Sequence, residues 1–248
     1  MEIPSQLIEK IKSAGEISVL TGAGISAESG VPTFRQAQVG LWAQYDPQEL
    51  ATPGAFQRNP KLVWEWYAWR REMIQQAAPN PGHLALAELA TLVSQLTLIT
   101  QNVDGLHQQA GSPQVIALHG NIMESKCFER EHLIADLPQE ESIPPRCPIC
   151  NSLLRPNVVW FGESLPASAL QTAVDAAQTC DLFISIGTSA LVQPAASLPL
   201  MALENGATLV EVNPEPTPLT RWVDFSIAGA AGVVLPALVN QLKQASFT

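Results

Sequence analysis

The chain has 248 residues, of which 46% are hydrophobic and 15% charged, so it can bury one substantial core and a small appended module. Its net charge of −10, with only 13 lysines and arginines, disfavours direct nucleic-acid binding. No apolar run approaches the ~18–20 residues of a membrane span, and residues 1–15 lack the apolar segment of a secretory signal. Four cysteines indicate a reduced compartment, so a cytoplasmic protein is expected. The protein is also expected to be soluble and monomeric.

Alternating strand and helix patterns predict an α/β fold with a Rossmann-like, doubly wound parallel sheet. After a first helix within residues 1–15, four apolar runs have the length and composition of buried strands: residues 17–20, 96–100, 182–186 and 208–212. Helical patterns lie between or after these runs: residues 80–92, 167–178, 194–203 and 231–244. A ligand of such a sheet binds beyond the carboxyl ends of its strands.

Two insertions interrupt the alternation. Residues 36–78 end in a tryptophan-rich helix around residues 63–76, and residues 124–155 contain cysteines and prolines. We therefore expect one domain over residues 1–248 with a large and a small part. The large part comprises residues 1–35, 79–123 and 156–248, and the two insertions form the small part.

A glycine-rich turn follows the first apolar run. Residues 22–35 read G-A-G-I-S-A-E-S-G-V-P-T-F-R, in which Gly22, Gly24 and Ala27 fit the G-x-G-x-x-G/A spacing. Small residues at this spacing let backbone amides approach a pyrophosphate at a helix N-terminus. The same turn could join a buried strand to a helix without any ligand. Polar groups also follow the next strands, with Gln101 and Asn102 after the second.

A hydride-transferring dehydrogenase shares the glycine turn. Its ribose-binding acid stands ~20 residues later, at the end of a second strand. Asp46 and Glu49 stand roughly there, but residues 36–45 have no strand character, which weakens this interpretation. Three residues near the end of the fourth run, Glu211, Asn213 and Glu215, are better placed for ribose contacts, or they are a solvated strand end.

Four further motifs occur in a fixed order. They are T-Q-N-V-D-G-L-H at residues 100–107, L-H-G at 118–120, V-V-W-F-G-E at 158–163 and G-T-S at 187–189. With the glycine turn, and from about Ser18 to about Pro236, the sequence resembles the sirtuin family of NAD-dependent protein-lysine deacylases. The resemblance implies a Rossmann-like part joined to a small helical and zinc-ribbon-like part, with NAD and an acyl-lysine protein or peptide meeting between them.

His119 is the candidate general base, because imidazole titrates near neutrality. A lone histidine after a strand can instead be a hydrogen-bonded structural residue, and His107 is interpreted as a helix-face residue. The resemblance gives His119 the catalytic role. In the family, the acyl oxygen attacks C1′ of the nicotinamide ribose and displaces nicotinamide. The histidine then deprotonates a ribose hydroxyl, and the acyl group leaves on ADP-ribose.

The resemblance also implies the NAD contacts. Asn102 and Asp104 seat the nicotinamide and its ribose, although Asp104 could instead cap the following helix. Phe34 shields the reactive face and Arg35 contacts the cofactor. The predicted NAD site is Gly22, Ala23, Gly24, Glu28, Thr33, Phe34, Arg35, Trp42, Gln101, Asn102, Asp104, Gly187, Thr188, Ser189, Asn213, Pro214, Glu215 and Ala231.

Tyr67 and Arg70 are spaced i,i+3 and so share a helix face. A phenol beside a guanidinium suits a carboxylate, but such a pair is also common on amphipathic helix surfaces. With A-T-P-G-A-F at residues 51–56, the pair resembles class III sirtuins, which remove succinyl and malonyl groups from lysine. Ala51 would leave room for the acyl group. A desuccinylase and demalonylase with weaker deacetylase activity is therefore expected.

Residues 158–163 are rich in β-branched and aromatic residues, which predicts an extended edge. This segment could pair with a substrate peptide, or it could be an ordinary core strand. The resemblance implies the first role. The segment's predicted substrate-binding residues are Val158, Val159, Trp160, Phe161 and Gly162.

Three cysteines have the spacing of zinc ligands: Cys127, Cys147 and Cys150. Arg130 stands where a fourth cysteine is expected, and a cation cannot ligate zinc. Glu129 or His132 completes the site, or zinc is weakly bound or absent. Cys180 is interpreted as core packing.

Two other activities share these motifs. The attack at C1′ can be intercepted by another nucleophile, which would give ADP-ribose transfer to a protein or to water. A non-catalytic module that senses NAD is the second alternative.

Overall fold

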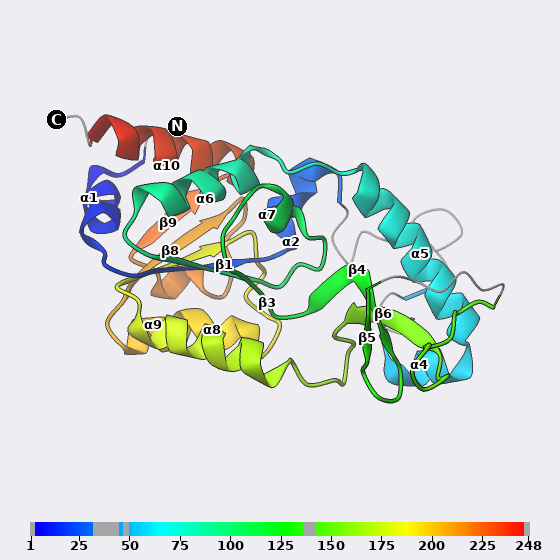
Figure 1. Ribbon diagram of the computed structural model, residues 1–248. Coiled ribbons are helices and arrows are strands. Elements are labelled where there is room, and N and C mark those ends of the chain that lie inside the picture. The colour runs from blue at the N-terminus through cyan, green and yellow to red at the C-terminus, as the bar shows by residue number, and fades with distance from the viewer. Residues whose placement is uncertain (1–2, 32–44, 47–49, 136–141, 246–248) are drawn as a thin grey trace.

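The computed structural model of the chain describes residues 3–31, 45–46, 50–135 and 142–245. Its large part is a parallel sheet with strand order β3-β2-β1-β7-β8-β9 (Figure 1). The strands are Val115–Ala117 (β3), Leu96–Thr100 (β2), Ile17–Thr21 (β1), Leu182–Ile186 (β7), Thr208–Asn213 (β8) and Phe225–Ala228 (β9). This is the order of a dinucleotide-binding sheet, so the predicted fold class is confirmed.

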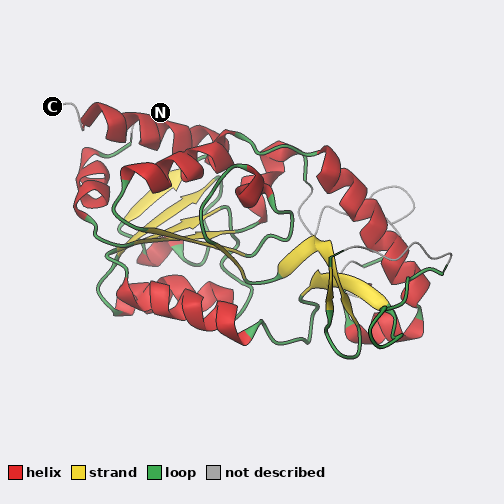
Figure 2. Cartoon of the chain, in the orientation of Figure 1, coloured by secondary structure: helices red, strands yellow, loops and turns green. Residues whose placement is uncertain are grey.

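Helices cover both faces of this sheet (Figure 2). One face packs against α1 (Ser5–Ser13), α6 (Pro81–Leu92) and α10 (Ala231–Ala245), and the other against α8 (Ala167–Thr179) and α9 (Leu198–Glu204). Successive strand residues point to opposite faces, so Val19 and Ile184 join the first core, whereas Leu20 and Phe183 join the second. Burial on both faces explains why these strands are continuous apolar runs.

In the residues that the structure describes, the small part has two helices and an antiparallel sheet of order β5-β4-β6, to the right in Figure 1. The helices are α4 (Pro53–Arg58) and α5 (Pro60–Gln76), and the strands are β4 (Gly120–Cys127), β5 (Leu133–Ile134) and β6 (Leu154–Val158). Phe56, Trp66, Ile122 and Trp160 are among the side chains of the core that joins helices and sheet. The boundaries expected at 123/124 and 155/156 fall inside β4 and β6, because the small sheet begins directly after His119.

Most predicted elements occur within a few residues of their expected bounds. Asn80 caps α6 instead of belonging to it, and its side-chain oxygen accepts the N–H of Gly82 at 2.9 Å. The helix expected over 194–203 is divided into a 3₁₀ turn, η3 (Ala195–Ser197), and α9, which has Pro199 in its first turn. Strand β9 was not predicted. Within the described residues, none of the helices combines the length and apolar character needed to cross a bilayer.

The extended edge expected over 158–163 is realised only up to Val158, where β6 ends. The following residues turn, because the N–H of Glu163 donates to the carbonyl of Trp160 at 3.0 Å. This expectation was wrong in extent: a turn replaces most of the strand.

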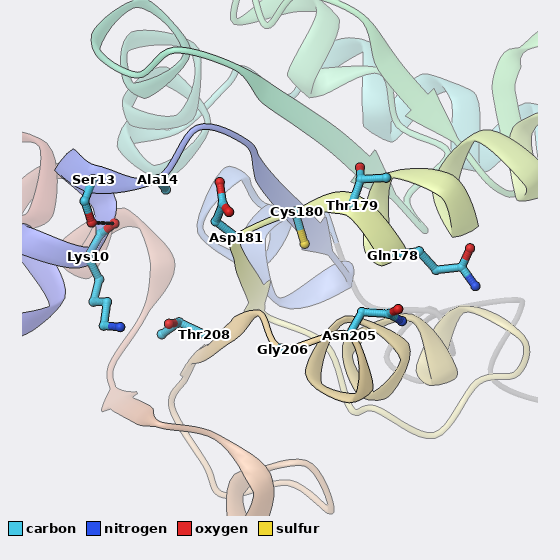
Figure 3. Close-up of a pocket in the computed structure, with 10 residues that line it drawn as sticks. All are labelled: Lys10, Ser13, Ala14, Gln178, Thr179, Cys180, Asp181, Asn205, Gly206 and Thr208. Carbon is cyan, nitrogen blue, oxygen red and sulfur yellow. Dashed lines mark hydrogen bonds between the residues drawn. The ribbon is translucent and has the colours of Figure 1, made fainter.

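A polar cavity of about 360 Å³ lies at the amino-terminal edge of the large sheet (Figure 3). Lys10, Asp181 and Thr208 are among the residues that line it. The carboxylate of Asp181 accepts the backbone N–H groups of Gly15 and Glu16 at 2.7 and 2.9 Å. Asp181 therefore joins the α1–β1 loop to the start of β7, and the predicted site lies at the opposite edge of the sheet.

Candidate functional site

The carboxyl ends of β1, β2 and β7 bring predicted NAD residues into one hydrogen-bonded group. The amide of Asn102 donates to the carbonyl of Gly22 at 3.0 Å and to the hydroxyl of Ser26 at 3.1 Å. The amide of Gln101 donates to the hydroxyl of Thr188 at 3.2 Å. Hydrogen bonds therefore join the loops after β1, β2 and β7, which are distant in sequence, at this edge of the sheet.

The glycine turn needs small residues because it packs against the loop after β7. A β-carbon on Gly22 would lie 2.8 Å from the carbonyl oxygen of Gly187, and one on Gly24 would lie 2.7 Å from the Cα of Gly187. The short helix α2 (Ala23–Ser26) begins here, and no side chain caps its first turn. The glycines thus allow two backbone segments to approach closely at the edge where a dinucleotide binds.

His119 lies between β3 and β4 and is half-buried. Its Nδ1 lies 2.8 Å from the carbonyl oxygen of Gln101, which can only accept, so Nδ1 carries the hydrogen and Nε2 is left as the acceptor. Burial lowers the pKa of His119, although the hydrogen bond to Gln101 opposes this change. The imidazole is therefore neutral near pH 7 and in the form that a general base requires.

A buried polar cluster beside Asn102 was not predicted from the sequence. The hydroxyl of Ser26 donates to Asp104 at 2.7 Å, and Nε2 of His83 lies 3.4 Å from the same hydroxyl. Asp104 also accepts the N–H of Leu106 at 3.0 Å, at the start of α7 (Leu106–Gln109), although the N-cap residue of this helix is Gly105. These contacts fix the orientation of the amide and carboxylate of the predicted nicotinamide site.

His107 lies on α7, as the helix-face interpretation expects, and is buried. Its Nε2 lies 2.9 Å from the hydroxyl of Thr21, and its ring centroid lies 4.9 Å from that of His83. Burial, with a smaller contribution from His83, lowers the pKa of His107 to about 3. It is therefore a neutral residue packed beneath the site.

The remaining predicted NAD residues differ in their surroundings. Glu28 accepts the N–H of Gly232 at 2.7 Å and so caps α10 next to the buried Ala231. Asn213 donates to the carbonyl of Glu215 at 2.6 Å, whereas Glu211 is buried and accepts the hydroxyls of two threonines in the following loop. Ala23 is half-buried, and Ser189 and Pro214 are exposed. Four predicted residues lie outside the described residues: Thr33, Phe34, Arg35 and Trp42.

Tyr67 and Arg70 are buried on α5, with exposed fractions of 2% and 9%, so they are not a solvated surface pair. The Arg70 guanidinium lies over the rings of Trp66 and Tyr67, at 5.1 and 5.7 Å from their centroids. Burial raises the pKa of Tyr67, and burial lowers the pKa of Arg70 while the neighbouring phenol opposes that change. A phenol and a guanidinium thus share one desolvated environment.

The segment after β6 connects the candidate base to this pair. The N–H of Val159 donates to the carbonyl of His119, and the N–H of Phe161 donates to the carbonyl of the buried Ala51, both at 2.9 Å. Trp160 is buried, whereas Phe161 is 45% exposed and Gly162 has a positive φ of 86°. The predicted substrate segment therefore bonds to His119 and to the residue before the N-cap of α4, and its Trp160 donates to Tyr67 on α5.

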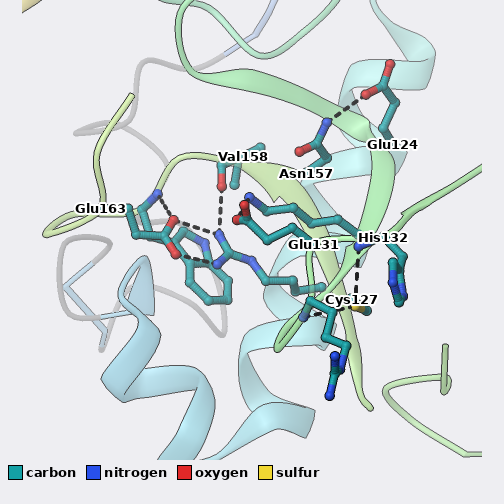
Figure 4. A network of polar contacts seen from close by, with 11 residues as sticks. Glu124, Cys127, Glu131, His132, Asn157, Val158 and Glu163 are labelled. Carbon is teal, nitrogen blue, oxygen red and sulfur yellow. Dashed lines mark hydrogen bonds and ion pairs between the residues drawn. The ribbon is translucent and has the colours of Figure 1, made fainter. Parts of the chain in front are cut away.

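Four potential metal ligands lie together in the small sheet: Cys127, His132, Cys147 and Cys150. Their ligand atoms all lie within 4.8 Å of one another, and this group excludes Glu129 and Arg130. Cys127 also accepts the N–H of His132 at 3.4 Å, as Figure 4 shows. Three sulfurs and one imidazole are a ligand set that structural zinc takes, so these residues fit zinc with His132 as the fourth ligand. Cys180 lies apart in the core, as predicted.

The large part is a parallel dinucleotide-binding sheet with a neutral histidine at its carboxyl edge, and the small part holds a Cys₃His cluster. Together these features define a two-part, nucleotide-dependent enzyme. The chain belongs to the Sir2 family, whose profile matches residues 22–194. A relative from Caldanaerobacter subterraneus, named NAD-dependent protein deacylase 1, is 56% identical over 217 residues, 87% of this chain and 89% of the relative.

Two solved structures extend this comparison. A Sir2 homologue in complex with NAD superposes with a TM-score of 0.92 at 47% identity, covering 98% of this chain and 95% of that chain. A Sir2 protein bound to an acetylated peptide superposes with a TM-score of 0.84 at 33% identity, covering 100% of both chains. The likeness therefore includes the small part as well as the sheet.

Proposed function

We propose that this protein removes acyl groups from protein lysines in an NAD-dependent reaction and prefers acidic acyl groups, such as succinyl and malonyl, to acetyl. Its membership of the Sir2 family, together with relatives named NAD-dependent protein deacylases, makes the chain an enzyme of that general kind. The acyl preference is the finer step, and the burial of Arg70 beside Tyr67 supports it.

The preference follows from the chemistry of the two side chains. A guanidinium donates two parallel hydrogen bonds to a carboxylate, and a phenol adds a third. Arg70 and Tyr67 lie in a core lined by aromatic side chains, where charged hydrogen bonds are stronger than in water. An acetyl group has no carboxylate, so it cannot accept these hydrogen bonds.

His119 acts as the base in this proposal. When bound, NAD supplies the glycosidic bond to nicotinamide that is broken as the acyl group passes to ADP-ribose. The free Nε2 of His119 accepts the proton of a ribose hydroxyl, and the hydrogen bond from Nδ1 to Gln101 keeps this tautomer in place. Asn102 and Asp104, fixed through Ser26, hold the nicotinamide end.

Zinc has a structural role in this proposal. Cys127 is the last residue of β4, and His132, Cys147 and Cys150 come from the loops around the small sheet. Zinc held by these ligands would fasten those loops and so maintain β6, which leads into the substrate segment.

The test compares kcat/KM on matched succinyl-, malonyl- and acetyl-lysine peptides for the native protein and for Arg70→Met. Native protein should favour the acidic acyl groups, and Arg70→Met should reduce that preference by roughly 10- to 100-fold, the range expected for lost hydrogen bonds to a charged group. Arg58→Met, at an exposed arginine on the neighbouring α4, is the matched control and should leave the preference unchanged. Equal preference in native protein and Arg70→Met would refute the acidic-acyl proposal.

A further inference from the structure

Tyr67 receives a hydrogen bond from the small sheet's side of the site. The indole Nε1–H of Trp160 donates to the phenol oxygen of Tyr67 at 3.0 Å, and both side chains are almost fully buried. An indole N–H can only donate, so the phenol oxygen must be the acceptor in this contact. The phenol's own hydrogen is then turned away from Trp160 and is available to another acceptor.

Trp160 is in turn held by an ion pair between the buried Arg155 and the partly buried Glu163. The guanidinium of Arg155 lies 3.3 Å from the centroid of the indole ring, and its two terminal nitrogens donate to the two carboxylate oxygens of Glu163. Glu163 also accepts the backbone N–H of Trp160 at 2.8 Å, and Arg155 donates to the carbonyl of Val158 at 2.7 Å. Figure 4 shows the contacts at Glu163 and Val158.

This arrangement restricts the indole. Arg155 is only 2% exposed, so moving the ring from beneath its guanidinium would disturb a buried charge and its bidentate partner. The ring centroids of Trp160 and Tyr67 are 6.4 Å apart. The Arg155–Glu163 pair, Trp160 and Tyr67 thus form one connected chain of contacts from β6 to α5, in which all members but Glu163 are buried.

We propose that Trp160 is a positioning residue for acyl selection: its indole N–H fixes the phenol of Tyr67 so that the phenol hydrogen, beside Arg70, is directed to the carboxylate of the acyl group. The inference rests on the acyl preference proposed above. The acyl preference then depends on Trp160, which donates to Tyr67 from the segment after β6. The Arg155–Glu163 pair holds the indole of Trp160 in place.

The test is a double-mutant cycle on succinyl- and acetyl-lysine peptides. Trp160→Phe removes the N–H but keeps a ring beneath Arg155, and it should lower the succinyl-to-acetyl ratio of kcat/KM by about 3- to 10-fold, the effect of one hydrogen bond. If Trp160 acts through Tyr67, Trp160→Phe combined with Tyr67→Phe should match Tyr67→Phe alone. Trp64→Phe is the matched control, because Trp64 packs in the cysteine cluster's core instead.

A second readout follows the phenol directly. The chain has only two tyrosines, so the ¹³C NMR signal of Tyr67 can be assigned with Tyr67→Phe. Trp160→Phe should raise the phenol's pKa, because the indole donor stabilises the ionised form, whereas Trp64→Phe should not change it. A titration of Tyr67 identical in native protein and Trp160→Phe would contradict the proposed contact.

The outcomes separate the two proposals. If native protein shows no preference for succinyl over acetyl, the proposed function is wrong. If the preference exists but Trp160→Phe retains it, or if the effects of Trp160→Phe and Tyr67→Phe simply add, the positioning role alone is overturned. Should Trp160→Phe fail to fold, Glu163→Gln replaces it, because this change removes the charge opposite Arg155. An unchanged acyl ratio in that variant would equally overturn the role.

Discussion

Replacing Gly120 with alanine tests how the candidate base is attached to the small sheet. Gly120 follows His119 at a φ of 80°, a left-handed conformation that costs an alanine about 1–2 kcal/mol. A β-carbon there would also lie 2.1 Å from the carbonyl oxygen of Asn157 and 3.2 Å from the Cα of Val158. Both contacts are with backbone, so β4 and β6 must separate, which adds about 1–3 kcal/mol of overpacking cost.

The total loss expected for Gly120→Ala is therefore about 2–5 kcal/mol in the free energy of unfolding. Equilibrium urea unfolding measures it, with Gly206→Ala as the matched control. Gly206 has a φ of 91° but nothing within 4 Å of the added carbon, so its variant should lose only the conformational contribution. If Gly120→Ala were no more destabilising than Gly206→Ala, the close backbone contact between Gly120, which follows His119, and β6 of the small sheet would be refuted.

Two further predictions concern the base and the metal. Because burial lowers the pKa of His119, its neutral form should persist below pH 6.5, and kcat/KM should fall only when the pH drops below that value. A loss of rate that begins above pH 7, or His119→Ala with native kcat, would contradict its role as base. Protein purified without chelator should contain about one zinc per chain, since the Cys₃His set is complete. His132→Ala should lower this ratio in metal analysis, whereas Glu129→Ala should not, and equal zinc in both variants would exclude His132 as a ligand.

The large sheet could be predicted from sequence because its central strands are buried on both faces. The runs at Leu96–Thr100 and Leu182–Ile186 match their observed strands at both ends. Phe225–Ala228 escaped prediction because this edge strand is short and only partly buried. The segment after Val158 was predicted as extended from its β-branched and aromatic residues, but a hydrogen bond between Glu163 and Trp160 turns it.

The site was predictable only where a motif marked it. Gly22 and Gln101 directly follow β1 and β2, His119 stands two residues after the partly buried β3, and the structure brings them to one edge. Ser26 and His83 gave no comparable signal, because their contacts depend on the packing of α6 against the glycine turn. The choice of His132 over Glu129 also required the fold, since sequence spacing alone admits both residues.

Transfer of a lysine acyl group to ADP-ribose is tested most directly by its products. Mass spectrometry follows them after incubation of the protein with NAD and a succinyl-lysine peptide. Native protein should release free lysine peptide, nicotinamide and O-succinyl-ADP-ribose in equal amounts. Unchanged peptide, or ADP-ribose attached to a protein, would contradict it.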